Sequence, residues 1–254
     1  MSGQSRRTVD AVQTACEILE VLQSKGQAGV TEIADEIGMA KGPVHRHLTT
    51  LDEQEYIVNE DGKYRLSLRY LDMANQVKKM VPKYDIITEE VQNLATETGE
   101  IAQFGTEEHG WVTYIYKADK ETDVQTASSP GKREYVHSTS LGKAMLSQMS
   151  DDYVESILEK HGMPKKTEHT CTDMKEFFRM LENTRDQGYA LDNEENIEGL
   201  RCIGMPVTGS ESEVLGAVSI SGPVSRMTDK RIENELVEAL TRATNVMEIN
   251  TKFA

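Results

Sequence analysis

Two serines, Ser219 and Ser221, have the spacing that places two side chains on the same face of a β-strand. Their hydroxyl groups can donate and accept hydrogen bonds toward one ligand. The segment Thr139, Ser140 and Leu141 is expected to open a helix, and the free N–H groups at a helix start bind carboxylates well. Together these groups suit a hydroxy acid or a keto acid. The alternative is that both serines are ordinary strand residues without a ligand.

A nucleophilic cysteine would be the most reactive group in this composition. Cys202 could be the nucleophile with His137 as its base, but such a pair must lie within hydrogen-bonding reach, and nothing in the local sequence places it there. Residues 84–254 contain no other recognisable reactive constellation. We therefore do not expect an enzyme. An enzyme with an accessory DNA-binding module is the alternative that a turnover assay on organic acids would test.

Disulfide formation and metal binding are not expected either. The three cysteines, Cys16, Cys171 and Cys202, are odd in number and widely spaced, which disfavours a disulfide framework and a zinc site of the CxxC type. A metal site from His161, His169 and Cys171 has only weak support in their spacing, and we interpret these residues as solvent-facing loop residues. No cofactor is expected.

A helix-turn-helix is predicted in the first part of the chain. Apolar residues recur at helical spacing over residues 10–24. A second helix begins at Thr31, which suits an N-cap, and ends at Gly38. A third begins with Pro43 at its first position and carries apolar residues to Leu51. Two short helices joined by about four residues that include a glycine form the helix-turn-helix pattern.

The third helix has a polar face that suits DNA. Short polar and guanidinium groups can contact base edges and phosphates in a major groove. Of the two histidines His45 and His47, at most one can share the groove-facing side, and the other packs or is exposed. The residues of this helix and its start that we expect to contact DNA are Lys41, Gly42, Pro43, His45, Arg46, Thr49 and Thr50.

A β-hairpin is predicted directly after this helix. The pair Asp61–Gly62 stands between the β-prone runs 56–59 and 63–66, which is the strongest local signal for a type I′ turn. Lys63 and Arg65 alternate with apolar residues, so both cations lie on one face of the hairpin. A basic hairpin in this position is a wing, and we expect Lys63 and Arg65 to bind phosphate or enter the minor groove.

The remaining residues predict a linker helix and a second, mixed domain. The linker helix covers residues 67–81, can pair with its copy in a dimer, and is stopped by Pro82. An α+β fold with an antiparallel sheet fits the order of the later elements, and Tyr114 and Tyr116 are interpreted as sheet residues rather than a ligand cage. The expected helices cover 84–98, 138–149, 151–160, 172–187 (capped by Thr172) and 228–250, and the expected strands 112–116, 122–126, 200–208 and 214–221.

Charge divides the chain into two parts with different roles. Residues 1–80 carry 10 Lys and Arg against 12 Asp and Glu, whereas residues 81–254 carry 18 against 31, within a net charge of −15. This acidity argues against a structural chromatin protein. It fits a high-salt cytoplasm, with an ordinary acidic bacterial protein as the alternative. Because no apolar run reaches a membrane span and no signal-peptide pattern is present, a cytoplasmic protein without membrane contact is expected.

Five sequence segments, taken together in this order, resemble the isocitrate-lyase-regulator (IclR) family of transcription factors over nearly the whole chain. The acidic composition is compatible with a halophilic archaeon or an ordinary bacterium as the source of the protein. The segments of the first domain are VTEIADEIGMAKGPVHRHLTTLDEQEYI and GKYRLSLRYLDMA, and those of the second are VHSTSLGKAMLS, GYALDNEENIEGLRCIGMPV and LGAVSISGP.

The resemblance implies a winged helix-turn-helix at residues 1–67, a linker helix at 68–82 and a GAF-like effector domain at 83–254. It implies homodimers or homotetramers that bind near-palindromic operators, and that repress or activate a catabolic operon in response to a small organic, sugar or aromatic acid. Effector-binding positions implied by the family's spacing, beside the segment Thr139, Ser140 and Leu141, are Asp192 after a strand, Cys202 at the start of the neighbouring strand, Ser219 and Ser221.

One departure from the family concerns the start of the recognition helix. Members of the family have Ser or Thr where this chain has Gly42 and Pro43. Two side-chain contacts to DNA are thereby removed, although backbone N–H groups at a helix start can still bind a phosphate. We therefore expect DNA binding to persist and the operator sequence to differ.

Overall fold

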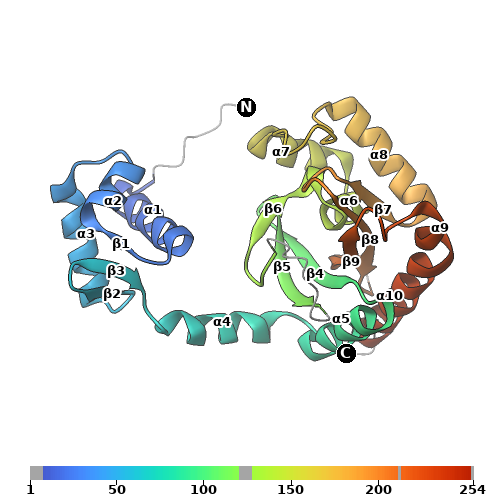
Figure 1. Ribbon diagram of the computed structural model, residues 1–254, viewed down its shortest axis with the longest axis horizontal. Helices are drawn as coiled ribbons and strands as arrows, with labels where there is room; N and C mark the ends of the chain where they lie inside the picture. Colours follow the sequence, from blue (N-terminus) through green and yellow to red (C-terminus); the bar gives the residue numbers. More distant parts are fainter. Residues whose placement is uncertain (1–7, 120–127, 211–212, 253–254) are drawn as a thin grey trace. The chain divides into compact units, whose positions relative to one another are not determined.

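The computed structural model describes residues 8–119, 128–210 and 213–252. The chain forms two compact units that divide after Met80 (Figure 1). The strand expected at residues 122–126 lies outside the described residues. Within the described ranges, no helix combines the length and the hydrophobicity that a membrane span needs.

The first unit packs three helices against a three-stranded antiparallel sheet. Its helices are α1 (Asp10–Lys25), α2 (Val30–Glu36) and α3 (Lys41–Glu53), and its strands are β1 (Ala28–Gly29), β2 (Ile57–Glu60) and β3 (Lys63–Leu66), in the order β1-β3-β2. Each helix presents one apolar stripe inward, as the helical spacing predicts. The buried side chains of this core include Ile18, Leu22, Ile33, Val44, Leu48, Ile57 and Tyr64.

Two details of the helix starts differ from the sequence-based expectations. Helix α2 begins one residue earlier than expected, and the Gly29 N–H donates to Glu32 Oε2 at 2.7 Å, so Thr31 is not the N-cap. Pro43 is the third residue of α3 rather than the first. This position costs no hydrogen bond, because the N–H groups of a helix's first turn have no intrahelical acceptor.

The hairpin has the turn that Asp61–Gly62 predicts. Both residues have positive φ, 52° and 84°, as a type I′ turn requires. The Gly62 N–H also donates to Asn59 Oδ1 at 2.9 Å, which closes the turn. In the ladder, Glu60 lies opposite Lys63. The short strand β1 pairs with β3 and was not expected from the sequence.

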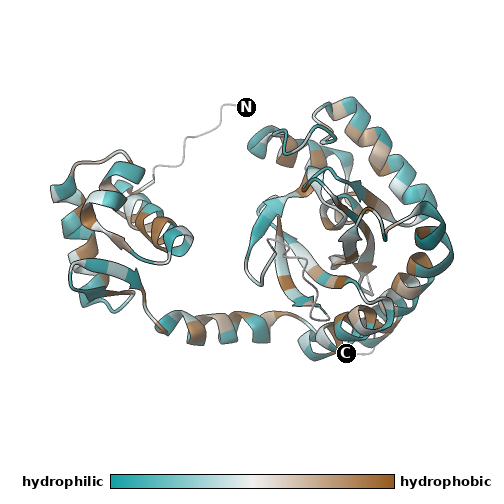
Figure 2. Cartoon of the chain, in the orientation of Figure 1, coloured by the Kyte–Doolittle hydropathy of each residue, from teal (hydrophilic) through white to brown (hydrophobic). Residues whose placement is uncertain are grey.

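Helix α4 (Arg69–Met80) has no buried residue. Its large apolar side chains are exposed, with Leu71 at 64%, Val77 at 60% and Met80 at 80%. Figure 2 shows hydrophobic bands that recur along α4 between hydrophilic ones. An amphipathic helix with an uncovered apolar face is typical of a surface that is buried in an assembly.

The second unit is built on a six-stranded antiparallel sheet in the order β6-β5-β4-β9-β8-β7, which confirms the expected α+β class. Helices α5 (Tyr84–Thr98) and α10 (Val237–Lys252) share an apolar core with one face of the sheet, and α6 (Ser140–Leu146), α7 (Asp151–His161) and α8 (Met174–Gln187) share a core with the other (Figure 1). The strands are β4 (Ile101–Glu108), β5 (Trp111–Ala118), β6 (Arg133–Tyr135), β7 (Ala190–Asn193), β8 (Leu200–Thr208) and β9 (Val214–Pro223).

Three features of this unit correct the sequence-based expectations. Strands β4, β6 and β7 were not expected. The first five residues of β4 are all buried, so the strand lacks the alternation that identifies one exposed face. Asp173, not Thr172, caps α8 by accepting from Glu176 N at 2.9 Å. The helix expected at 228–250 runs from Asp229 to Lys252, but it contains a π-helical turn (Ile232–Leu236) between α9 (Asp229–Arg231) and α10 that was not expected.

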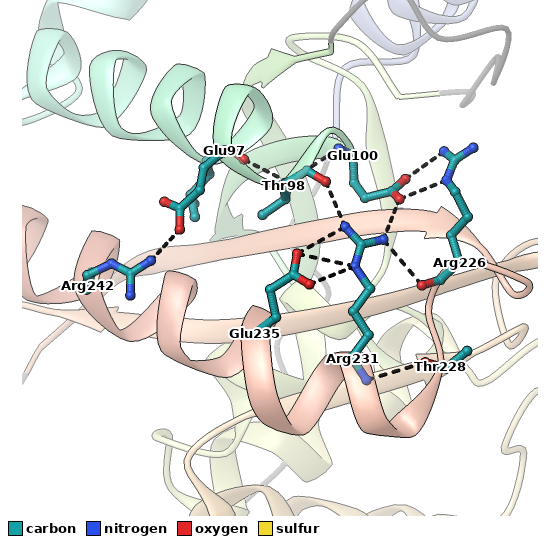
Figure 3. Close-up of polar contacts among 9 residues, drawn as sticks. Glu97, Thr98, Glu100, Arg226, Thr228, Arg231, Glu235 and Arg242 are labelled. Carbon is teal, nitrogen blue, oxygen red and sulfur yellow. Dashed lines mark hydrogen bonds and ion pairs between the residues drawn. The ribbon is translucent and has the colours of Figure 1, made fainter.

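A buried carboxylate joins α5 and β4 to the segment before α10 (Figure 3). Glu100 is 2% exposed and receives Arg226 Nε at 2.8 Å, Arg226 Nη2 at 2.7 Å and Arg231 Nη1 at 2.8 Å. Arg231 also donates to the Thr98 carbonyl at 2.7 Å, at the end of α5. Burial by itself raises the pKa of Glu100, but the hydrogen bonds and charges of the two arginines together lower the pKa below its usual value.

We expect Glu100→Gln to destabilise the protein by about 2–4 kcal/mol, because breaking a buried ion pair leaves charges without their partner. The matched control is Glu97→Gln, since Glu97 pairs with Arg242 at the surface, where such pairs contribute about 0–1 kcal/mol. The free energy of unfolding from urea titrations at pH 7 measures both. Equal losses of unfolding free energy in the two variants would show that the buried Glu100 ion pairs contribute no more to stability than a surface pair.

The same variant has a defined pH dependence. The pKa of Glu100 is lower in the folded state, so its contribution is present above the ordinary carboxyl pKa of 4.5 and is lost as the pH falls through the lowered value. The difference in unfolding free energy between wild type and Glu100→Gln should therefore shrink in strongly acidic solution.

Candidate functional site

The third helix, α3, divides into a buried face and an exposed face. Val44 and Leu48 are 0% exposed and hold the helix on its unit. His45 and Arg46 lie on the exposed face, whereas His47 is half-buried. The two histidines thus lie in different environments, as expected from the sequence, because at most one of them can share the exposed face.

Local hydrogen bonds on this face leave the guanidinium available. The hydroxyls of Thr49 and Thr50 donate to the carbonyls one turn earlier, those of His45 and Arg46, at 2.9 and 3.0 Å. Within the described parts of the chain, no carboxylate forms an ion pair with Arg46. An exposed arginine without a carboxylate partner is the group that pairs with guanine edges or phosphates.

The start of α3 is open. Lys41 and Gly42 are exposed, and a side chain built at Gly42 would meet nothing within 4 Å. Pro43 is half-buried and has no N–H to offer. The first-turn N–H groups of Lys41 and Gly42 need a partner outside the helix, and a phosphate oxygen meets that need.

The hairpin presents its two cations differently. Lys63 is exposed. Arg65 is half-buried and its Nε and Nη2 donate to Glu60 Oε1 at 2.9 and 2.5 Å. To contact DNA, Arg65 must therefore break its hydrogen bonds to Glu60 or divide its N–H groups between Glu60 and a phosphate. Lys63 is exposed and can bind a phosphate directly.

In the second unit, all seven residues expected at the effector site line one cavity. The sheet explains how distant residues meet. Asp192 on β7 lies opposite Cys202 on β8, and Cys202 lies opposite Ser221 on β9, so the three form one row across the strands. Two expectations are corrected here: Asp192 lies within a strand rather than after one, and Cys202 is the third residue of β8 rather than its first.

The two serines occur on the cavity side of β9 because side chains alternate along a strand. Val218 and Ile220, which alternate with Ser219 and Ser221, face the apolar core under α5 and α10. The serines therefore point toward α6, on the opposite face. Ser219 is 1% and Ser221 4% exposed, so their hydroxyls are screened from bulk solvent.

Helix α6 closes the cavity from above the sheet. Thr139 is its N-cap and accepts from Gly142 N at 3.1 Å, so α6 begins at Ser140, two residues after the expected start at residue 138 and within the segment expected to open a helix. The helix start lies directly on β8 at Gly204, where a Cβ atom would be 2.8 Å from the Ser140 carbonyl oxygen. Only a glycine permits this close approach, which brings Leu141 and its neighbours to the cavity.

Other lining residues were not identified from the sequence. Gln103 is held in one orientation, because its Oε1 accepts from Ser219 Oγ at 3.4 Å and its Nε2 donates to Ser128 Oγ at 2.5 Å. Tyr114 lines the cavity as well as the sheet, which corrects its interpretation as a sheet residue only. Gln103 was missed because β4 was missed. The lining residues not expected are Gln103, Tyr114, Ser128, Glu134, Asn196, Ile197 and Leu200.

Two ionisable groups in the cavity, Asp192 and Cys202, have pKa values shifted toward their neutral forms. Burial, opposed by Lys143 and assisted by Glu195, raises the pKa of Asp192 to about 6. Burial and then the Asp192 carboxylate raise the pKa of the Cys202 thiol, which disfavours the nucleophilic thiolate. His137 does not line the cavity; its Nε2 donates to the Pro164 carbonyl at 3.1 Å.

The loop histidines do not form a metal centre in the described residues, where no group of three potential ligands is found. His161 is the last residue of α7 rather than a solvent-facing loop residue. Its ring lies 4.6 Å from that of Trp111, and its Nε2 bonds the His109 carbonyl at 2.7 Å. Its role here is packing between α7 and β5.

Two family models match the chain. Residues 79–248 match "Bacterial transcriptional regulator IclR C-terminal", and residues 11–61 match "IclR helix-turn-helix domain". The helix-turn-helix match covers the three helices and the first strand of the hairpin, and the C-terminal match covers the whole cavity.

Similar proteins extend the same relationship over nearly the full length. The chain is 30% identical to the HTH-type transcriptional regulator KdgR of Escherichia coli, covering 93% of this chain and 92% of that protein. It is 26% identical to a probable HTH-type transcriptional regulator ArcR of Halobacterium salinarum, covering 100% and 97%. A solved IclR homolog from Microbacterium hydrocarbonoxydans, complexed with 4-hydroxybenzoate, has a TM-score of 0.79 at 20% identity, covering 96% and 100%.

Proposed function

This chain belongs to the IclR family of transcriptional regulators, and on that premise we propose that it controls a catabolic operon as a repressor or activator responsive to a small acid. The family consists of regulators rather than enzymes. The observation that carries the proposal is the convergence of Asp192, Cys202, Ser219 and Ser221 on one screened cavity in a chain that also carries an exposed recognition helix.

We propose that α3 enters the major groove of a near-palindromic operator and that the hairpin contacts the flanking backbone. The exposed Arg46 and the open start of α3 support this docking. The residues proposed to contact DNA are those of the sequence-based prediction: Lys41, Gly42, Pro43, His45, Arg46, Thr49, Thr50, Lys63 and Arg65.

For the assembly, we propose a homodimer or a homotetramer in which α4 pairs with its copy. The exposed apolar face of α4 supports the pairing, because isologous pairing would bury Met73, Val77 and Met80, which share one face of the helix. A two-fold dimer matches the two half-sites of a palindromic operator. The functional division proposed remains a winged helix-turn-helix at 1–67, a linker at 68–82 and a GAF-like effector domain at 83–254, acting in the cytoplasm where the DNA is.

The proposed effector is a small organic, sugar or aromatic acid bound in the cavity. Hydroxyl and amide groups on the walls can hold a ligand's hydroxyl and carboxyl oxygens. The Microbacterium homolog was solved with an aromatic acid, which makes 4-hydroxybenzoate a suitable first probe. Effector and operator must change each other's affinity by the same factor.

Chromatin immunoprecipitation of the protein in its native host tests the regulator function directly. We expect discrete occupied sites beside a catabolic operon, whose substrate then indicates the effector, and whose transcript level in a deletion strain gives the sign of regulation. Diffuse or absent occupancy would contradict sequence-specific regulation.

A further prediction concerns salt. Protein–DNA affinity normally falls steeply with salt because cation–phosphate contacts release counterions. This chain carries a net charge of −15, so binding DNA should also take up cations between acidic protein and phosphate. We expect a shallow or inverted dependence of log K on log salt, measured by fluorescence anisotropy on the operator.

The control variant replaces two exposed carboxylates at the end of α3, Asp52→Asn with Glu53→Gln. Without them the slope should become steeper, by up to about 0.9 for each carboxylate. A wild-type slope as steep as that of ordinary regulators would contradict the cation-uptake account.

A further inference from the structure

The cavity proposed to bind an acid has acidic walls. Its lining includes the carboxyl groups of Asp192 and Glu134, and among the described residues that line it none is a Lys, Arg or His. An anion placed in this cavity meets negative charge and no cationic side chain. Burial of an unpaired negative charge beside another is strongly unfavourable.

The nearest cations are already paired. Lys143, on α6, forms an ion pair with Glu195 in which both side chains are almost fully buried, 1% and 5% exposed. On the other wall, Lys132 and Lys166 lie 3.3 and 3.4 Å from the carboxylate of Glu134. Lys143 thus compensates Glu195, and Lys132 and Lys166 both compensate the single carboxylate of Glu134. None of these three lysines lines the cavity itself.

Asp192 is the carboxyl group that can change its charge. It is 3% exposed, and its Oδ1 accepts from Glu195 N at 2.8 Å and Asn196 N at 3.3 Å, which fixes the orientation of the carboxyl group. Those two N–H groups and Lys143 favour the ionised form, whereas burial and Glu195 oppose it, and the pKa rises to about 6. The ionisable groups around Asp192 are Lys143 on α6, Glu195 after β7, Cys202 on β8, Tyr114 on β5 and Glu134 on β6.

We propose that Asp192 couples ligand binding in this cavity to proton uptake. A carboxylate ligand binds together with one proton, which Asp192 takes up from solvent. The protonated carboxyl group then donates a hydrogen bond to the ligand, and its charge no longer repels the ligand's carboxylate. The proposal rests on the proposed small-acid effector and adds to it that binding is proton-linked.

The sign of the pH dependence follows from the free and bound forms. In the free cavity Asp192 is mostly ionised at pH 7, and in the complex with an acid it is protonated, so its pKa is higher in the complex. Acid binding is therefore strongest below pH 6 and weakens as the pH rises, by up to about tenfold per pH unit, until the pKa of the complex is reached.

Isothermal titration calorimetry on the full chain measures the proton directly. The probes are glyoxylate, pyruvate, gluconate and 4-hydroxybenzoate, each titrated at pH 7 in two buffers that differ in ionisation enthalpy, and again between pH 5.5 and 8. We expect uptake of about 0.5–1 proton for each acid bound. In Asp192→Asn, a neutral side chain of the same shape, the uptake should vanish and the affinity should become independent of pH.

The control is Asp152→Asn, an exposed carboxyl group in the first turn of α7, which should keep the wild-type uptake. No uptake in the wild type, or unchanged uptake in Asp192→Asn, would overturn the proposal. If none of the four acids binds at any pH, both the proposal of a small-acid effector and the proposal of proton-linked binding are wrong. Discrete operator occupancy would still support the regulator function.

A second measurement does not depend on a variant that folds. In wild-type protein labelled with ¹³C at the Asp carboxyl carbons, one buried resonance should titrate near pH 6. On saturation with a binding acid, its midpoint should move above pH 7. A set of resonances that all titrate near the ordinary pKa of aspartate would overturn the assignment to Asp192.

Discussion

Arg46→Ala should abolish specific operator binding and leave the fold intact. Arg46 is exposed on α3 and has no carboxylate partner in the described residues, so its replacement removes no contact that stabilises the unit. A bidentate arginine–guanine pair contributes about 1–3 kcal/mol of discrimination. A dimer would present two copies, so the loss is about 2–6 kcal/mol, a large part of the margin of about 4–10 kcal/mol between specific and non-specific binding.

Electrophoretic mobility or anisotropy measurements on operator and scrambled DNA test this, with circular dichroism to verify the fold. Arg46→Lys is the matched control. Lysine keeps the charge but not the planar, two-donor geometry, so it should retain non-specific binding and lose most of the specificity. Operator affinity unchanged in Arg46→Ala, with native circular dichroism, would show that α3 is not the recognition helix.

The second large effect is expected from Asp192→Ala combined with Ser219→Ala. Both residues line the cavity of the second unit, at strands β7 and β9, and neither belongs to the unit that carries α3. Operator binding should persist, and release or recruitment by the effector should disappear. Removing both a carboxyl group and a hydroxyl group leaves the ligand's polar atoms buried without partners, at a cost of about 1–3 kcal/mol each.

A double variant on the exposed face of α7, Asp152→Ala with Ser156→Ala, provides the control for this experiment. It removes the same chemical groups from a surface outside the cavity, and it should respond to the effector as the wild type does. Operator binding measured with and without the effector compares the two. A cavity variant that still responds normally would place the effector site elsewhere.

Much of the first unit could be predicted from the sequence because the signals are local. The spacing of Val44, Leu48 and Leu51 defines the inner face of α3, and the positive φ angles of Asp61 and Gly62 follow from their residue types. The errors were local too. Gly29 rather than Thr31 is the N-cap of α2, since the Glu32 side chain accepts a hydrogen bond from the Gly29 N–H.

The second unit was less predictable because its sheet is buried on both faces. Strand β4 begins with five consecutive buried residues and therefore shows no alternation. Missing β4 meant missing Gln103, although Ser219 hydrogen-bonds to its amide. Strand β7 has four residues, too few for periodicity to distinguish it from a loop, so the pattern did not show that Asp192 lies within a strand.

By itself, the sequence determined the helix-turn-helix, the hairpin turn and the α+β class, because these follow from patterns among neighbouring residues. The proposed effector positions were implied by the resemblance to the family. Only the tertiary structure decided which groups meet. Strand order aligned Asp192, Cys202 and Ser221 in one row, and Gly204 let α6 approach the sheet. Lys143 is paired with Glu195 and provides no free cation to the cavity, because burying an unpaired charge costs much free energy.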